Sequence, residues 1–162
     1  MKSAAPQTGT INLRTILDVS RIIFIDDDKK DAALSELAET LSHDSRIHDH
    51  EELINAIRRR EELMSTGIGL GVGVPHVRID SVDDIVMAVG VCRKPLTNYD
   101  SLDDEPVRII CMIAANTSQH AKHIKLLSAV SKLLKDSSVR DSIISAASTH
   151  TVFDIFTGES HA

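Results

Sequence analysis

Two nearly continuous apolar runs constrain the fold of this chain more than any other feature. They span Ile85 to Cys92 (IVMAVGVC) and Val107 to Ala115 (VRIICMIAA). Apolar runs without alternating polar residues are typical of strands that are covered on both faces. A sheet built around two such strands needs a layer of helices on each side, so the chain is predicted to have an α/β fold.

The apolar patterns in the rest of the chain predict a further strand and the helices that would form those layers. Ile22 to Ile25 is predicted to add a short strand, and three aspartates follow it at the start of a helix that ends near Leu41. Further helices are expected at about residues 12–17, 51–64, 117–135, 138–147 and 152–156. Thr117 and Ser118 are the expected caps of the 117–135 helix, and residues 93–106 are expected to form a polar loop.

No internal repeat, low-complexity segment or linker interrupts this pattern, and 162 residues fit one domain. The prediction is therefore a single α/β domain over residues 11–158, with a mixed β-sheet sandwiched between helices. Residues 1–10 contain Pro6 and Gly9 and are predicted to be a flexible N-terminal tail.

Composition and charge exclude several classes of partner. The formal net charge is -6 and aromatic residues make up 2% of the chain, so neither a basic DNA-binding face nor a base-stacking platform is expected. No apolar run approaches the roughly 20 residues that span a membrane, and no signal peptide is visible, which predicts a cytoplasmic protein without membrane insertion. Cys92 and Cys111 lie inside the apolar runs, so we expect buried free thiols.

A glycine-rich segment leads into a histidine. Glycine occupies every second position from 67 to 73, and the segment ends in Val74-Pro75-His76. A P-loop would end in Gly-Lys-Ser/Thr, and a dinucleotide fingerprint needs glycine where Val72 or Val74 stands, so neither nucleotide site is expected. Two interpretations stay open: a structural bend, or a cradle of backbone N–H groups for an anion on a neighbouring side chain.

The residues around His76 favour phosphoryl chemistry. The preceding proline gives His76 a stiff backbone, and neutral imidazole is a good nucleophile near pH 7. Phosphoryl transfer needs mainly positioning and charge stabilisation. Arg60 can offer a bidentate guanidinium and Thr66 a hydroxyl donor. His120 and His123 are three positions apart on one predicted helix, so they share a face and either could support a phosphorylated His76.

Three motifs and a helix together resemble the signature of the fructose/mannitol-type (type 2) enzyme IIA family of the bacterial sugar phosphotransferase system. They are Arg60-Glu61, Ser65-Thr66-Gly67-Ile68-Gly69, Gly73-Val74-Pro75-His76 and the stretch from His123 to Leu134. The resemblance spans about residues 12–156. It implies a sheet sandwiched by helices and a phosphotransferase activity that requires no metal and no organic cofactor.

The same resemblance implies a role for each matching residue. His76 matches the histidine that receives phosphate from the small carrier protein HPr. His123 matches the histidine that packs beside it and supports the phosphoryl group, and Arg60 matches the arginine that helps to hold that group. Val77 departs from the family pattern, where many members have glycine, and this difference is expected to narrow access to the site without changing the nucleophile.

Two roles within the family compete. A nitrogen-regulatory type controls partner proteins through its phosphorylation state, whereas a sugar-transport subunit passes phosphate to a cysteine of enzyme IIB. The Ser65–Gly69 motif and the lack of an attached IIB, IIC or HPr domain favour the regulatory type. We expect HPr and the regulated partner to dock on one apolar rim beside His76. That rim is expected to consist of Ile68, Leu70 and Val74, with the acidic residues Asp80, Asp83 and Asp84 nearby in sequence.

Alternatives from other classes are a module that senses an anion without covalent chemistry and a metal-dependent hydrolase. The hydrolase would use His76, His120 and His123, but it lacks a carboxylate motif at ligand spacing. A second histidine group consists of His43, His48 and His50, which lie among acidic residues before a helix. This group is expected to be a solvated turn rather than a metal site.

Overall fold

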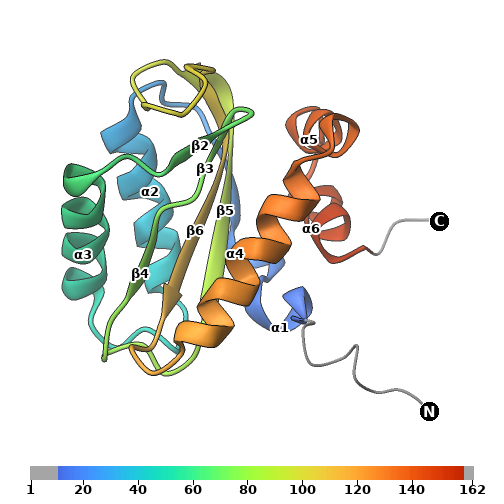
Figure 1. The fold of residues 1–162 in the computed structure, drawn as a ribbon. Helices are drawn as coiled ribbons and strands as arrows, with labels where there is room; N and C mark the ends of the chain where they lie inside the picture. Colours follow the sequence, from blue (N-terminus) through green and yellow to red (C-terminus); the bar gives the residue numbers. More distant parts are fainter. Residues whose placement is uncertain (1–10, 159–162) are drawn as a thin grey trace, which may run out of the picture.

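The two apolar runs form the centre of a mixed sheet in the computed structural model, which describes residues 11–158 (Figure 1). They become β5 (Val86–Leu96) and β6 (Val107–Ala115), which pair antiparallel. Met112 and Ala114 of β6 face one core, and Cys111 and Ile113 face the other. Both faces are therefore covered, as predicted. The predicted tail at residues 1–10 lies outside the described residues.

Four shorter strands complete the sheet. β1 (Ile22–Ile25) runs parallel to β5, and β3 (Val72–Gly73) and β4 (His76–Arg78) both run parallel to β6. β2 (Gly67–Gly69) pairs antiparallel with β3. The spatial order is β1-β5-β6-β3-β2, and β4 also pairs with β6. The prediction of a mixed sheet is thereby confirmed.

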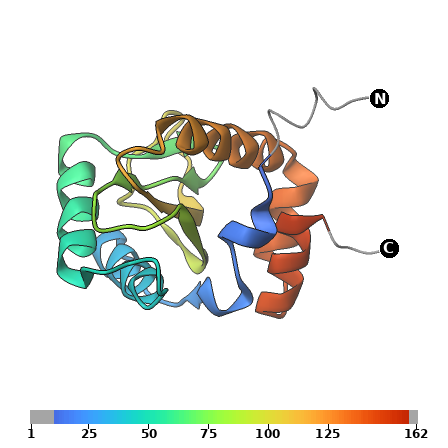
Figure 2. The same cartoon turned by 90° about the horizontal axis from the view of Figure 1, so that it is seen from below.

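Helices cover both faces of this sheet (Figures 1 and 2). α2 (Lys30–Ser42) and α3 (His50–Leu63) build one core with it. The other core contains side chains of α1 (Leu13–Ile16), α4 (His120–Leu134), α5 (Ser137–Ile144) and α6 (Thr149–Thr157). A short 3-10 turn, η2 (Val19–Arg21), leads into β1. The predicted sandwich of a sheet between helices is confirmed.

The predicted start of the loop at residue 93 is wrong, because β5 continues to Leu96. In this extension Arg93 and Lys94 are exposed, and the strand returns to the core at Leu96, which is fully buried. The Arg93 guanidinium lies 4.2 Å from the ring centroid of Phe24, a cation–π contact that supports the extended strand at its exposed positions.

The prediction that Thr117 or Ser118 caps the following helix is wrong, because α4 begins at His120 with Gln119 as its N-cap. A polar turn occupies the positions before it. Asn116 Oδ1 accepts a hydrogen bond from the Ser118 N–H, and Gln119 Oε1 accepts one from the Asn116 N–H. The hydroxyl groups of the two predicted caps are used elsewhere: Thr117 donates to Asp80 Oδ1 and Ser118 donates to Asn116 Oδ1.

Both cysteines are buried and free, as predicted. Burial raises the pKa of the Cys92 thiol and of the Cys111 thiol to about 12, so neither is a reactive thiolate near neutral pH. Within residues 11–158, no helix combines the length and the apolar character that crossing a membrane requires.

Candidate functional site

A cavity of about 510 Å³ lies where α3, β4 and α4 meet. β4 runs between the two helices in Figure 1. The residues that line the cavity are Ala56, Arg59, Arg60, Leu63, His76, Val77, Arg78, Ile79, His120, His123, Ile124 and Leu127. The structure therefore brings together four of the residues singled out from the sequence: His76, His120, His123 and Arg60.

His76 is held as one defined tautomer at the start of β4. Its Nδ1 lies 2.6 Å from the carbonyl oxygen of Val74. A carbonyl oxygen can only accept a hydrogen bond, so Nδ1 carries the proton and Nε2 keeps its lone pair. The backbone on either side is fixed as well, because the Pro75 carbonyl accepts a hydrogen bond of 2.9 Å from the Ile113 N–H. His76 is thus a partly exposed nitrogen nucleophile on a stiff support.

His123 lies beside His76 and is almost fully buried. The two ring centroids are 5.1 Å apart, at an interplanar angle of 78°. Only 4% of His123 is exposed, and its Nε2 has no hydrogen-bond partner among the described residues. Burial, reinforced by His76, Arg78 and His120, lowers the pKa of His123 from 6.5 to about 4. The imidazole is therefore neutral near pH 7, with a ring nitrogen left to bind an incoming group.

Three arginines give the cavity a positive charge. Arg60 donates from Nη1 to the carbonyl oxygen of Met64 at 2.8 Å. Arg59 and Arg78 line the same cavity, and none of the three guanidinium groups forms an ion pair within the described part of the chain. Unpaired guanidinium groups in a shared cavity are well suited to bind a dianion.

Arg59 and Arg78 are cavity residues that the sequence reasoning missed. Arg78 is two positions after His76 on β4, and residues i and i+2 of a strand share a face. This spacing was a signal that the sequence offered. Arg59 lies in the basic run at residues 58–60, where sequence alone did not distinguish the exposed positions from those facing a site.

Thr66 is not brought to this cavity. Its hydroxyl donates to Glu61 Oε2 and lies 2.6 Å from the Tyr99 hydroxyl, and only 5% of the residue is exposed. The alternating glycines at positions 67 to 73 do not line the cavity either. A Cβ at Gly67 would lie 2.2 Å from the Asp100 carbonyl oxygen, and a Cβ at Gly73 would lie 2.7 Å from Tyr99.

The glycines thus allow the segment to pack against residues 99–106. The cradle interpretation is wrong in this fold, and the structural alternative explains the glycine pattern.

The expected docking rim needs a correction too. Val74 is buried, with 3% exposed, and Ile68 and Leu70 are exposed but do not line the cavity. The apolar residues at the cavity are Leu63, Ile124 and Leu127. The three aspartates that are near His76 in sequence do not line the cavity: Asp80 accepts from Thr117, Asp83 pairs with His48 and Asp84 accepts from Gln119. β2 pairs with β3, which lies beside residues 109–110 of β6, whereas β4 lies beside residues 113–115. Nearness in sequence to His76 therefore does not place Ile68 or Leu70 at the cavity.

The histidines do not form a metal site. Among residues 11–158, no three His, Cys, Asp or Glu side chains converge as a metal ion would require, so the hydrolase alternative has no geometric support. In the second histidine group, the rings of His43 and His50 make an edge contact at 5.8 Å, and His48 pairs with an aspartate.

Comparison with known proteins assigns the chain to a family. The family model described as "Phosphoenolpyruvate-dependent sugar phosphotransferase system, EIIA 2" matches residues 15–158. The chain is 29% identical over 126 residues to the fructose-specific EIIA component of Haloferax volcanii, with 78% of this chain and 81% of that protein covered. It is 26% identical over 146 residues to the nitrogen regulatory protein of Pseudomonas aeruginosa, with 90% and 94% covered.

Solved structures of proteins from this family have the same fold as this chain. The nitrogen regulatory protein IIA-Ntr from Neisseria meningitidis superposes with a TM-score of 0.82 at 27% identity, covering 90% of this chain and 99% of that chain. The IIA mannitol structure from Escherichia coli has the same fold, with a TM-score of 0.74 at 22% identity over 86% of this chain and 98% of that chain. The resemblance carried by the sequence motifs is confirmed: the chain belongs to the EIIA 2 family of the phosphoenolpyruvate-dependent sugar phosphotransferase system, and it is a phosphocarrier domain.

Proposed function

We propose that His76 accepts the phosphoryl group, on Nε2, from the phosphohistidine of an HPr-like carrier. The observation that carries the proposal is the Nδ1 hydrogen bond to the Val74 carbonyl. It leaves Nε2 with its lone pair, in a cavity lined by three arginines that have no ion-pair partner among the described residues. The Nε2 lone pair forms the new P–N bond while the donor's P–N bond breaks and its electron pair returns to the donor's imidazole. Val74 then stabilises the positive charge that develops on the His76 ring.

The other cavity residues stabilise the transferred group. Arg60 supplies a guanidinium fork, and Arg78 and Arg59 add positive charge against the phosphoryl oxygens. His123 is neutral, and its unpartnered Nε2 donates a hydrogen bond to a phosphoryl oxygen when it carries the ring proton. No metal and no organic cofactor take part in this proposal, since the chain's own side chains neutralise the charge.

The experiment is incubation with phosphoenolpyruvate, enzyme I and HPr. The wild-type protein should gain one acid-labile phosphate, and NMR of the labelled imidazole should place it on Nε2. His76→Ala should keep its circular-dichroism spectrum and gain none. Labelling of His76→Ala at the wild-type level would assign the phosphate to another residue. Anion binding without covalent labelling of the wild type would support the sensing module instead.

We further propose a regulatory role in the cytoplasm. Nitrogen regulatory proteins match nearly the full length of the chain, and the buried free thiols fit a reducing compartment. Phosphorylation neutralises a positive cavity beside exposed Leu63 and Ile124, so a partner that docks there should prefer one phosphorylation state.

Pull-downs from cell extract with His76→Ala and with enzymatically phosphorylated wild type test this role. Distinct partner sets support it. Identical partner sets, together with rapid transfer to the cysteine of an enzyme IIB, would establish the sugar-transport role.

A further inference from the structure

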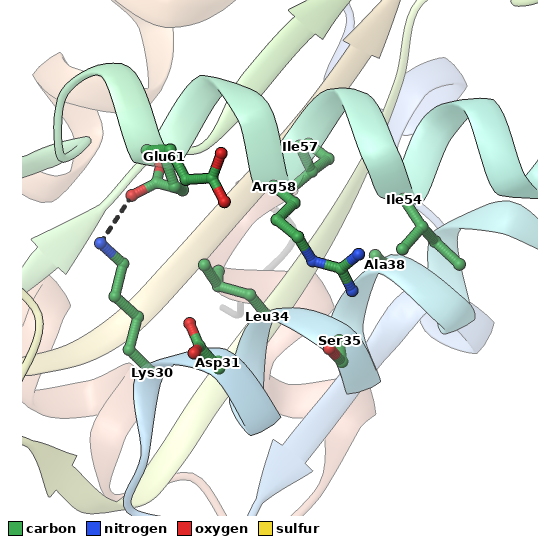
Figure 3. A pocket seen from close by; sticks show the side chains of 10 residues that line it. Lys30, Asp31, Leu34, Ser35, Ala38, Ile54, Ile57, Arg58 and Glu61 are labelled. Carbon is green, nitrogen blue, oxygen red and sulfur yellow. Dashed lines mark ion pairs between the residues drawn. The ribbon is translucent and has the colours of Figure 1, made fainter.

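A chain of buried and largely buried polar side chains joins four segments of the fold. It runs from Tyr99 to Thr66, from Thr66 to Glu61, and from Glu61 to Lys30. The Tyr99 and Thr66 hydroxyl oxygens are 2.6 Å apart, and Lys30 Nζ lies 2.9 Å from Glu61 Oε1. The Lys30–Glu61 pair lies at one end of a second cavity, of about 330 Å³, between α2 and α3 (Figure 3).

The direction of each hydrogen bond in this chain follows from the groups present. The Glu61 carboxylate only accepts, so the Thr66 hydroxyl must give its single proton to Glu61 Oε2. Thr66 Oγ1 can then only accept from Tyr99, which must be the donor. Burial raises the pKa of the Tyr99 hydroxyl, with the nearby Glu61 charge adding to the effect, so this donor keeps its proton. Each side-chain polar group of the network therefore has at least one partner within it.

The burial of the network gives its bonds a fixed geometry. Thr66 is 5% exposed, Tyr99 is 3% exposed, and the Glu61 side chain is 7% exposed. Lys30 adds a cation–π contact, with Nζ 4.4 Å from the centroid of the Tyr99 ring. Buried, fully satisfied polar networks hold their members in one arrangement.

Both ends of the phosphoryl site are attached to this network. Glu61 is adjacent to Arg60 in the last turn of α3. The Thr66 carbonyl accepts a 3.0 Å hydrogen bond from the Val74 N–H, and the Val74 carbonyl holds His76 Nδ1. The Tyr99 ring also packs against Gly73, one residue before Val74. One polar cluster thus connects the helix that carries Arg60 with the strand that carries His76.

We propose that the Lys30–Glu61–Thr66–Tyr99 network positions Arg60 relative to His76 for phosphoryl transfer, with Thr66 as a positioning residue that never touches the phosphoryl group. This inference rests on the proposed function of His76. Transfer depends steeply on geometry: a mutation far from the chemistry that misplaces the reacting groups by about 1 Å can slow a reaction about 100-fold.

Thr66→Val tests the proposal, because it keeps the shape of the side chain and removes the hydroxyl. The saturating rate of transfer from phospho-HPr should fall about tenfold. The half-saturating concentration of phospho-HPr should stay unchanged, because exposed Leu63 and Ile124 are untouched. Thr66→Ser retains the hydroxyl and should restore the rate.

Ser81→Ala is the matched control. Ser81 donates its hydroxyl to Glu52, a carboxylate at the other end of α3, and neither residue lines the cavity. This variant should lose a comparable amount of thermal stability and transfer phosphate at the wild-type rate. Equal slowing of Ser81→Ala and Thr66→Val would reduce the network to a structural role and overturn the proposal.

A second readout is independent of transfer. Proton exchange at His76 Nδ1–H, followed by NMR, should accelerate in Thr66→Val and stay unchanged in Thr66→Ser and Ser81→Ala. A wild-type protein that accepts no phosphate would overturn the proposed function, while this exchange measurement would still decide whether the network holds His76. Unchanged exchange in Thr66→Val would overturn the positioning role even if phosphate transfer is confirmed.

Discussion

At the scale of single residues, the two central histidines have the same side chain and opposite environments. His76 is partly exposed, and its tautomer is fixed by the Val74 carbonyl. His123 is buried without a partner for Nε2, and this environment depresses its pKa. Environment rather than residue type therefore separates the proposed nucleophile from the proposed stabilising group.

His123→Ala should slow phosphate transfer from phospho-HPr about 100-fold, because it removes a buried hydrogen-bond donor from the transition state. His120→Ala should slow it less than about tenfold, since His120 is exposed and water screens its contribution. Rapid-quench measurement of transfer rates checks both variants. A larger loss for His120→Ala would exchange the roles assigned to the two histidines.

His123 should also make the folded state sensitive to acid. Its pKa of about 4 in the folded state lies below the ordinary value of 6.5, so the unfolded chain binds more protons between these values. The contribution of His123 to the free energy of unfolding should therefore decrease as the pH falls from 6.5 to 4, and it should be constant above pH 6.5.

Urea denaturation across that pH range measures the effect. His123→Gln removes the titrating group, so its stability should depend less on pH than that of the wild type. Parallel curves for the two proteins would show that His123 is not protonated on unfolding.

At the scale of elements, the glycine segment owes its composition to packing. β2 and β3 lie so close to the loop after β5 that side chains at Gly67 and Gly73 would meet backbone or a buried ring. Gly90, on central β5, faces a different neighbour: a Cβ there would lie 2.5 Å from the end of the flexible Ile25 side chain.

Gly73→Ala should therefore destabilise the protein more than Gly90→Ala. The Tyr99 ring is fixed by its hydrogen bond and cannot move aside, so overpacking should cost about 1–3 kcal/mol. The Ile25 terminus can rotate, so Gly90→Ala should lie at the lower end of this range. Free energies of unfolding from urea titrations compare the two. A more damaging Gly90→Ala would mean that the central strand is the less adaptable element.

At the scale of the whole molecule, the face that carries the cavity differs in charge from the chain as a whole. The chain carries a formal net charge of -6, but the cavity contains three arginines that form no ion pair within residues 11–158. Leu63, which is 84% exposed, and Ile124, which is 51% exposed, lie at the same cavity. An apolar edge around a positive cavity is suited to a partner that presents a phosphoryl group at its own surface.

Leu63→Ser should raise the half-saturating concentration of phospho-HPr about five- to tenfold, which corresponds to the loss of roughly 1 kcal/mol of apolar contact. The saturating rate should change little, because the reacting groups remain in place. Leu102→Ser is the matched control, since Leu102 is 86% exposed and lies outside the cavity. Equal effects of the two substitutions on transfer kinetics would show that Leu63 does not contact the carrier.

The sequence by itself predicted the architecture and three residues that line the candidate site, namely His76, His123 and Arg60. The apolar runs of β5 and β6 predicted central strands, because a strand that is buried on both faces needs an apolar residue at nearly every position. The spacing of His120 and His123 predicted a shared helix face for the same reason, since helical periodicity is a local property. Glycine at alternate positions indicated close backbone packing but not which neighbour required it.

Only the tertiary structure decided which groups are paired. The Thr66 hydroxyl could have donated a hydrogen bond to a phosphoryl group. In the fold it donates to Glu61 instead and is hydrogen-bonded to Tyr99, 33 positions away. Arg78 gained a place in the cavity because β4 pairs with β6 and turns its face toward α3 and α4. Hydrogen-bond partners and unpaired charges depend on contacts between distant segments, and these contacts leave no periodic pattern in a single sequence.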